Sequence, residues 1–160
     1  ELLKLATRLR EGNEVPQGLP VTLDLPPAFR PLGRIATGAD SGLCDILHIL
    51  GLIPQGKYAL CGIGQHVDDL VMGDVTSESL AEIWAENSIL NALRNGLPGQ
   101  LKGICAQCLM NRVCRGNCVA ANYNSGRDLF APFWFCQRAF EQGLFPASRL
   151  RLVDEGSHLA

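Results

Sequence analysis

The sequence predicts an α+β fold, a small irregular domain with a β-hairpin and a few helices. Two short apolar runs flank a Pro-Gln-Gly turn at residues 54–56, and this pattern is typical of a hairpin. A capping-box pattern that starts at Ser79 indicates an amphipathic helix. Seven cysteines lie among 17 glycines and 9 prolines, which indicates irregular backbone wrapped around something.

The first part of the chain predicts one helix and one strand. Residues 1–12 carry leucines at helical spacing, and residues 19–25 form an apolar, β-branched run that two prolines end. No capping residue precedes the helix, and the chain does not start with methionine. We therefore expect residues 1–37 to be the partial end of a preceding domain in a longer protein.

The main domain is expected over residues 38–146. Residues 47–53 and 57–61 predict the two hairpin strands. Residues 79–96 predict the clearest helix, which ends at a glycine and should dock on the hairpin. The apolar stripe of this helix consists of Leu80, Ile83, Trp84, Leu90 and Leu93.

Weaker patterns follow this helix. Residues 119–123 and 137–143 predict two further short helical segments, and residues 147–160 predict a flexible tail. Trp84 and the aromatic residues within 130–135 are expected to pack in the core.

Composition excludes several classes of function. The net charge is −2, so no basic field is available to hold a nucleic-acid backbone. No apolar run approaches the roughly 20 residues that cross a bilayer. Neither a Ser-His-Asp order, nor a phosphate loop, nor paired carboxylates stand out. Nucleic acid and membrane are therefore not expected partners.

The cysteines carry the strongest signal. Their odd count and the size of the chain argue against a secreted disulfide framework, so we expect a reducing, cytoplasmic compartment. Four of them form a C-x2-C-x5-C-x3-C pattern, in which the turn of a C-x-x-C directs two thiolates to one metal centre. Sulfur ligands select zinc, copper(I) or an iron-sulfur cluster. These four are Cys105, Cys108, Cys114 and Cys118.

The spacing of the four cysteines alone predicts one structural zinc ion, in a binding module without a redox role. That interpretation leaves Cys44, Cys61 and Cys136 unused, although the predicted hairpin brings Cys44 and Cys61 close together. Seven ligands suit two centres better than one. Gly116 is expected to relieve crowding where the backbone comes close to such a centre.

The full pattern resembles the SPASM domain, which extends many radical SAM enzymes at their C-terminal end. It consists of C-x11-G-x4-C over 44–61, then the four-cysteine segment over 105–118, then Cys136. The segments IPQGKYALC at 53–61 and LVMGDVTSESLAEIW at 70–84 are also similar to that family. The resemblance covers about residues 38–140, and the residues before it resemble the last helix and strand of a radical SAM barrel.

This resemblance implies two auxiliary iron-sulfur clusters, usually 4Fe-4S. The ligands of auxiliary cluster I would be Cys44, Cys61 and Cys118. The ligands of auxiliary cluster II would be Cys105, Cys108, Cys114 and Cys136. Such domains support electron transfer or substrate binding in oxidoreductases and maturases that modify a peptide or protein, ribosomal peptides included.

Cluster I is one cysteine short. We expect either an iron left open to substrate or water, or ligation by Asp45 or His48, although a core or surface histidine is the simpler reading of His48. Three arginines are candidates to donate to cluster sulfurs or to attract an anionic substrate. These are Arg112, Arg115 and Arg127. His66, Asp68 and Asp69 are expected in a solvated loop.

The chain lacks the C-x3-C-x2-C motif with which radical SAM enzymes bind their catalytic cluster. S-adenosylmethionine and a third 4Fe-4S cluster would therefore belong to a barrel outside these residues. The chain is expected to be either the end of a larger enzyme or a stand-alone auxiliary-cluster partner of a separate barrel protein.

Overall fold

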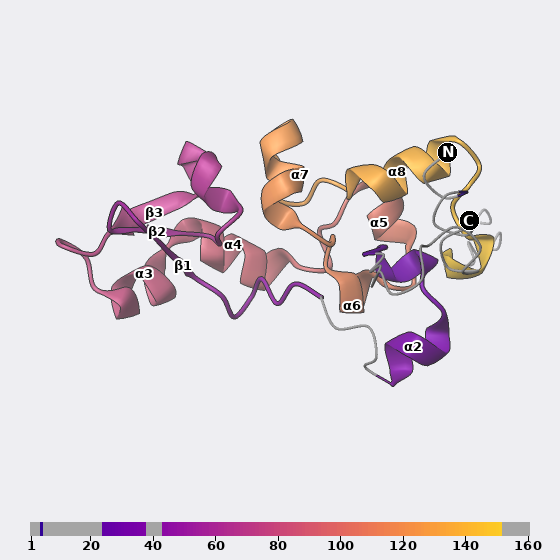
Figure 1. The fold of residues 1–160 in the computed structure, drawn as a ribbon, viewed down its shortest axis with the longest axis horizontal. Coiled ribbons are helices and arrows are strands. Elements are labelled where there is room, and N and C mark those ends of the chain that lie inside the picture. The colour runs from indigo at the N-terminus through magenta and orange to yellow at the C-terminus, as the bar shows by residue number, and fades with distance from the viewer. Residues whose placement is uncertain (1–3, 5–23, 38–42, 152–160) are drawn as a thin grey trace, which may run out of the picture.

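The computed structural model describes Lys4, residues 24–37 and residues 43–151 (Figure 1). The predicted N-terminal helix, most of the predicted strand over 19–25 and most of the predicted tail lie outside the described residues. The first described elements are short. A 3-10 helix, η1 (Pro27–Phe29), begins at a proline, where the missing N–H costs nothing. It is followed by α2 (Leu32–Ala36).

A three-stranded antiparallel sheet follows, in the order β1-β2-β3. Its strands are β1 (Gly51–Ile53), β2 (Lys57–Ala59) and β3 (Val71–Asp74). The predicted hairpin is confirmed, with Leu52 opposite Tyr58 and with Gly56 at the positive φ of 71° that the turn needs. The first strand is shorter than predicted because the chain turns at residues 46–48. The third strand was not predicted.

The predicted long helix is two helices, α3 (Leu80–Glu86) and α4 (Ser88–Gly96). The capping box of Ser79 and Glu82 is confirmed. The break lies at Asn87, whose backbone is extended and whose side chain caps α4 by accepting from the N–H groups of Ile89 and Leu90. The two helices bury Ile83, Leu90 and Leu93, as predicted. Leu80, the first residue of α3, is 56% exposed, contrary to the predicted apolar stripe.

Short helices make up the rest of the fold. Two 3-10 helices join β2 to β3, namely η2 (Gly64–His66) and η3 (Asp68–Leu70). The cysteine-rich half contains α5 (Gly103–Gln107), α6 (Asn111–Cys114), α7 (Val119–Gly126), α8 (Trp134–Glu141) and the 3-10 helix η4 (Ala147–Arg149). The last two predicted helical segments are therefore confirmed, with α7 longer and α8 starting earlier than predicted.

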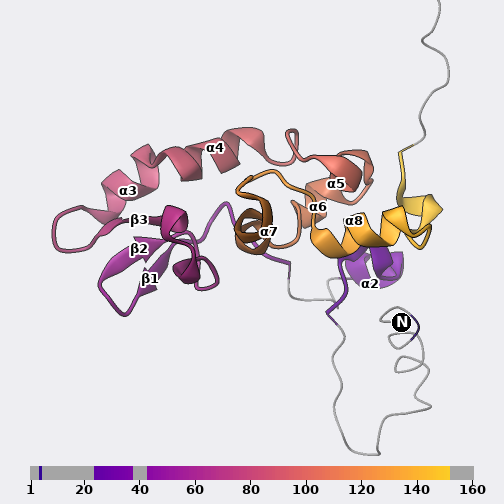
Figure 2. The same ribbon diagram turned by 90° about the horizontal axis from the view of Figure 1, so that it is seen from above.

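The elements form an elongated body (Figures 1 and 2). The sheet and α3 lie at one end, α5, α6 and α8 lie at the other, and α4 and α7 lie between them. One core runs through both ends, from Leu60 and Leu70 beside the sheet to Ile104 and Cys105 in α5. This mixture of helices and a small sheet confirms the α+β class.

Two features of the surface differ from expectation or limit function. Phe130 and Phe133 pack against the core as predicted, whereas Trp134, the first residue of α8, is 55% exposed, contrary to prediction. Trp84 is half-buried and stacks under the guanidinium of Arg94 at 4.3 Å. Among the described helices, none has the length and apolarity that a membrane span requires.

Candidate metal centres

All seven cysteines lie in the described residues, and all are free thiols. Cys105, Cys108 and Cys136 are buried and the other four are half-buried. None of these seven cysteines is paired in a disulfide in the structure. Seven thiols in the core of a 160-residue chain call for another explanation.

Four of these thiols share one cavity, and we call them cysteine set II: Cys105, Cys108, Cys114 and Cys136. The apolar side chains of Ile104 and Phe145 also line this cavity. Burial, together with the charges of Cys105 and Cys108, raises the pKa of the Cys114 thiol to about 12. Burial likewise raises the pKa of Cys136, with added effects from the other three thiols. Cys136 therefore lies within electrostatic range of the other three thiols of this set.

The other three thiols form a separate group, which we call cysteine set I: Cys44, Cys61 and Cys118. Burial raises the pKa of the Cys44 thiol, and the charges of Cys118 and Cys61 raise it further. Cys44 precedes β1, Cys61 follows β2, and Cys118 lies at the start of α7. The hairpin and α7 thus bring together residues from three distant segments.

The spacing within each set bears on the kind of metal. A zinc ion with sulfur ligands at 2.3 Å holds them about 3.8 Å from one another. Across the described residues, no three His, Cys, Asp or Glu side chains gather closely enough to hold a single metal ion. The described residues therefore contain no preformed site for a single metal ion.

Backbone N–H groups point at several of the sulfurs. Gly64 N lies 3.4 Å from the Sγ of Cys61 and Met110 N lies 3.3 Å from the Sγ of Cys108. Phe133 N lies 3.5 Å from the Sγ of Cys105. Such donors stabilise the thiolate form that binds metal, so the chemistry of the donor set fits an iron-sulfur cluster.

The link between the two sets has unusual backbone geometry. Arg115, Gly116 and Asn117 separate Cys114 of set II from Cys118 of set I, and their φ angles are 49°, 84° and 62°. This left-handed turn directs N–H groups of Asn117 and Gly116 at the Cys114 sulfur, which lowers its pKa against the larger effect of burial. Glycine adopts a φ of 84° without strain, and the expected close approach of Gly116 to a metal centre stays a prediction.

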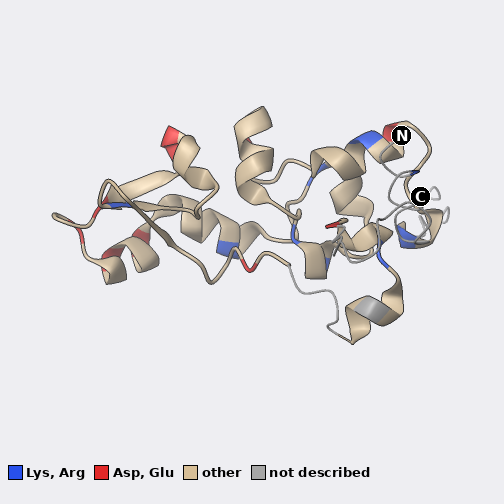
Figure 3. Ribbon diagram, viewed as in Figure 1, with Lys and Arg blue, Asp and Glu red and all other residues tan. Residues whose placement is uncertain are grey.

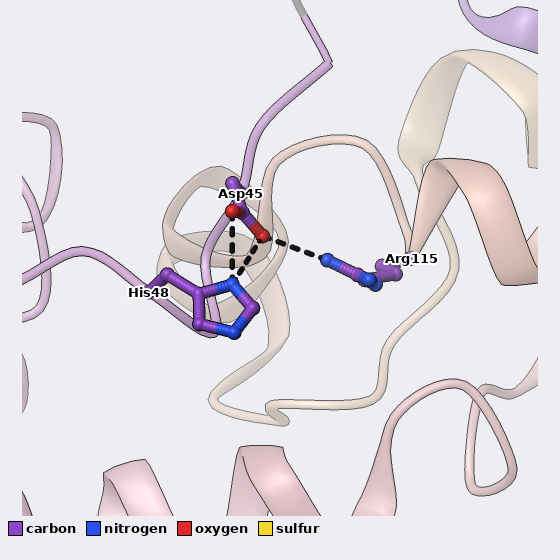
Figure 4. A network of polar contacts seen from close by, with 3 residues as sticks. All are labelled: Asp45, His48 and Arg115. Carbon is purple, nitrogen blue, oxygen red and sulfur yellow. Dashed lines mark hydrogen bonds and ion pairs between the residues drawn. The ribbon is translucent and has the colours of Figure 1, made fainter.

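An ion-pair network ties cysteine set I to this link (Figure 4). The Oδ1 of Asp45, the residue after Cys44, accepts from Nη1 of Arg115 at 2.8 Å. The same carboxylate lies 2.8 Å from Nδ1 of His48. The hydrogen bond to His48 and the guanidinium of Arg115 hold the pKa of Asp45 below its ordinary value. The carboxylate of Asp45 is therefore already engaged, and its role as a cluster ligand stays a prediction.

A second network includes Asp69, which was expected in a solvated loop, and Arg127, which was a candidate donor to cluster sulfur. Asp69 in η3 accepts from Nη1 of Arg127 at 3.0 Å and from the hydroxyl of Tyr123 at 3.1 Å. Asp69 is thus a fixing point for α7, not only a solvated loop residue. Arg127 is engaged here and not at a cysteine.

Sequence reasoning missed Arg149, which lies in the predicted tail. Leu109 N donates to Arg149 O at 2.8 Å, and Leu150 pairs with Cys108 in a β-bridge. The guanidinium donates through Nη2 to Arg30 O, while its Nε is buried without a partner in the described part of the chain. Burial raises the pKa of Cys108, and the Met110 N–H and the charges of Arg149 and Arg151 oppose that effect. In the sequence, the only signal of this contact was the pair of arginines Arg149 and Arg151, which follow the last cysteine.

Comparison with known proteins gives consistent matches. Residues 44–109 match the family model of SPASM, an iron-sulfur cluster-binding domain. The mycofactocin maturase MftC of Mycolicibacterium smegmatis is 28% identical over 134 residues, which cover 81% of this chain and 33% of that protein. The mycofactocin maturase MftC of Mycobacterium tuberculosis is 31% identical over 104 residues, which cover 64% of this chain and 26% of that protein. No solved structure matches significantly.

The chain thus spans about a third or less of the length of these curated relatives. The family match contains two cysteines of set I, Cys44 and Cys61, and two of set II, Cys105 and Cys108. It also contains the whole sheet with α3 and α4. The expected family is confirmed. Residues 44–109 belong to the SPASM family of iron-sulfur cluster-binding domains.

Proposed function

We propose that this chain is the auxiliary-cluster part of a radical SAM maturase that modifies a peptide. The maturase names of its relatives support the proposal. The observation that carries it is the division of seven free thiols into two separate neighbour groups, one of three and one of four. The barrel that binds S-adenosylmethionine would be part of the same polypeptide or a separate partner protein.

Cysteine set II would hold one 4Fe-4S cluster with a complete shell of four thiolates. Cysteine set I would hold a second cluster with three thiolates, and its fourth iron would take a substrate group, water, Asp45 or His48. The division of charge effects among the thiols supports this split, since Cys118 acts on Cys44 while Cys114 is affected by Cys105 and Cys108.

When bound, such clusters accept and donate single electrons at potentials that their surroundings set. The chain contributes those surroundings. The buried positions of Cys105, Cys108 and Cys136 exclude water from set II, and the N–H groups of Met110 and Phe133 stabilise negative charge on sulfur. Cys114 and Cys118 are joined by three residues with positive φ, so this short link would hold the two centres close to each other.

The test is the metal content of anaerobically purified protein. We expect about eight iron and eight sulfide per chain, with the brown absorption of iron-sulfur clusters. Colourless protein with one tightly bound zinc would overturn the proposal in favour of the zinc-stabilised binding module. An Asp45→Ala, His48→Ala pair of variants with unchanged cluster spectra would exclude both side chains as the fourth ligand.

A further inference from the structure

A groove of about 540 Å³ opens beside the two cysteine sets. Its apolar wall includes Leu47, which follows Cys44 by three residues, and Ala106, which lies between Cys105 and Cys108. Leu97 and Pro98, from the connection of α4 to α5, extend this wall. The groove therefore touches the segments of both cysteine sets, and its volume is that of a small-ligand site.

Three guanidinium groups line the same groove, from Arg112, Arg115 and Arg151. Asn111, which is buried, accepts from Nη2 of Arg151 at 3.1 Å and orients that side chain. Asp45 orients Arg115 at 2.8 Å. Arg112 has no hydrogen bond or ion pair to any described side chain, and it is exposed. Among the described residues, no acidic side chain lines the groove, and no acidic side chain pairs with Arg112 or Arg151.

Acidic and basic residues are distributed unevenly along the chain, and most residues that line the groove come from its basic part. Residues 97–151 contain seven Lys or Arg and two Asp or Glu, whereas residues 51–96 contain two and six. Figure 3 shows most of the acidic residues at the sheet end and most of the basic residues beyond α4. An anionic ligand would be repelled by the sheet end and attracted to the groove.

We propose that this groove binds a segment of the peptide substrate in which a carboxylate side chain neighbours an aliphatic one. Guanidinium forks match carboxylate oxygens in bidentate pairs, and the apolar wall accepts the aliphatic neighbour. A peptide bound there lies over the link between the two cysteine sets. The inference rests on the proposed function, because it takes the ligand to be the peptide that the maturase modifies.

The test uses two fluorescein-labelled probe peptides, one alternating leucine with glutamate and one alternating leucine with glutamine. Their binding to the anaerobically purified chain is measured by fluorescence anisotropy. We expect the glutamate probe to bind at least about tenfold more tightly. R112Q and R151Q should each weaken it by about tenfold. R138Q, which removes the same charge from a 71% exposed position on α8, should leave it unchanged.

Three results overturn the inference. They are equal binding of the two probes, an equal loss in R138Q, and displacement of the glutamate probe by inorganic phosphate at lower concentration than by free glutarate, which would indicate a phosphate ligand. Iron content is measured for every variant. Full iron without probe binding overturns the groove alone, whereas wild-type protein without iron overturns the proposed function and the groove with it.

Discussion

The two cysteine sets are built in different ways. Set II takes its four thiols from α5, its C-cap residue Cys108, α6 and α8, which lie together at one end of the molecule, and three of the four are buried. Set I takes three half-buried thiols from a loop before β1, the end of β2 and the start of α7. Set II is therefore held mainly by the cysteine segment itself, whereas the position of Cys118 in set I depends on the contact of η3 with α7.

The residues that join the two sets sharpen this difference. Arg115, Gly116 and Asn117 all have positive φ, a conformation that costs non-glycine residues about 1 kcal/mol or more each. These three residues lie where one short segment supplies Cys114 to set II and Cys118 to set I. Cys114 and Cys118 are close in sequence, yet the turn between them directs them to different sets. Membership of a set therefore depends on the path of the backbone and not on spacing in the sequence.

The largest effect is expected when one cysteine of a set is replaced by alanine. C118A should remove the cluster of set I and leave that of set II, and C105A should do the reverse, because each cysteine serves one set. Iron should fall from about eight to about four per chain in both variants. Low-temperature electron paramagnetic resonance of the reduced variants identifies the surviving cluster. If C118A loses the cluster of set II instead, the C-x2-C-x5-C-x3-C spacing is the better guide to the ligands.

A smaller effect is expected at the link. In G116A the new Cβ lies 3.2 Å from Cδ2 of Leu101 at a φ of 84°, so we expect a loss of about 1–2 kcal/mol in the free energy of unfolding and a disturbance of both sets. Denaturant titration with absorbance of the clusters measures both. G126A is the matched control, because nothing lies within 4 Å of its new Cβ. Equal losses in both variants would show that the link is not a special position.

The sequence could predict the features that depend on neighbours in the chain. The Pro-Gln-Gly turn, the capping box at Ser79 and the four-cysteine segment were all visible, because short-range chemistry determines each of them. The third strand was missed because β3 is held by pairing with β2, and the break at Asn87 was missed because an apolar stripe continues across it. Arg149 reaches Cys108 only through tertiary contact.

Arg149 permits a test that separates the two sets by potential. The positive charge of Arg149 lowers the pKa of the Cys108 thiol against the effect of burial. R149Q should therefore make the potential of the set II cluster more negative, by about 60 mV, which for one electron corresponds to a tenfold change in the equilibrium constant. The potential of set I should not change. R138Q controls for the lost charge. A redox titration that moves both clusters equally would instead indicate a general electrostatic effect.

The smallest effect is expected where α7 is fixed to the sheet end, and it concerns set I alone. Asp69 accepts from Arg127 and Tyr123, and removing its charge in D69N should cost about 0.5 kcal/mol of stability, since the pair is half-exposed. Because Cys118 begins α7, the cluster of set I should bleach faster in air while that of set II bleaches at the wild-type rate. D68N is the matched control, since Asp68 is the neighbouring carboxylate and makes no such contacts among the described residues. Faster bleaching of set II in D69N would contradict the view that packing of α7 holds set I only.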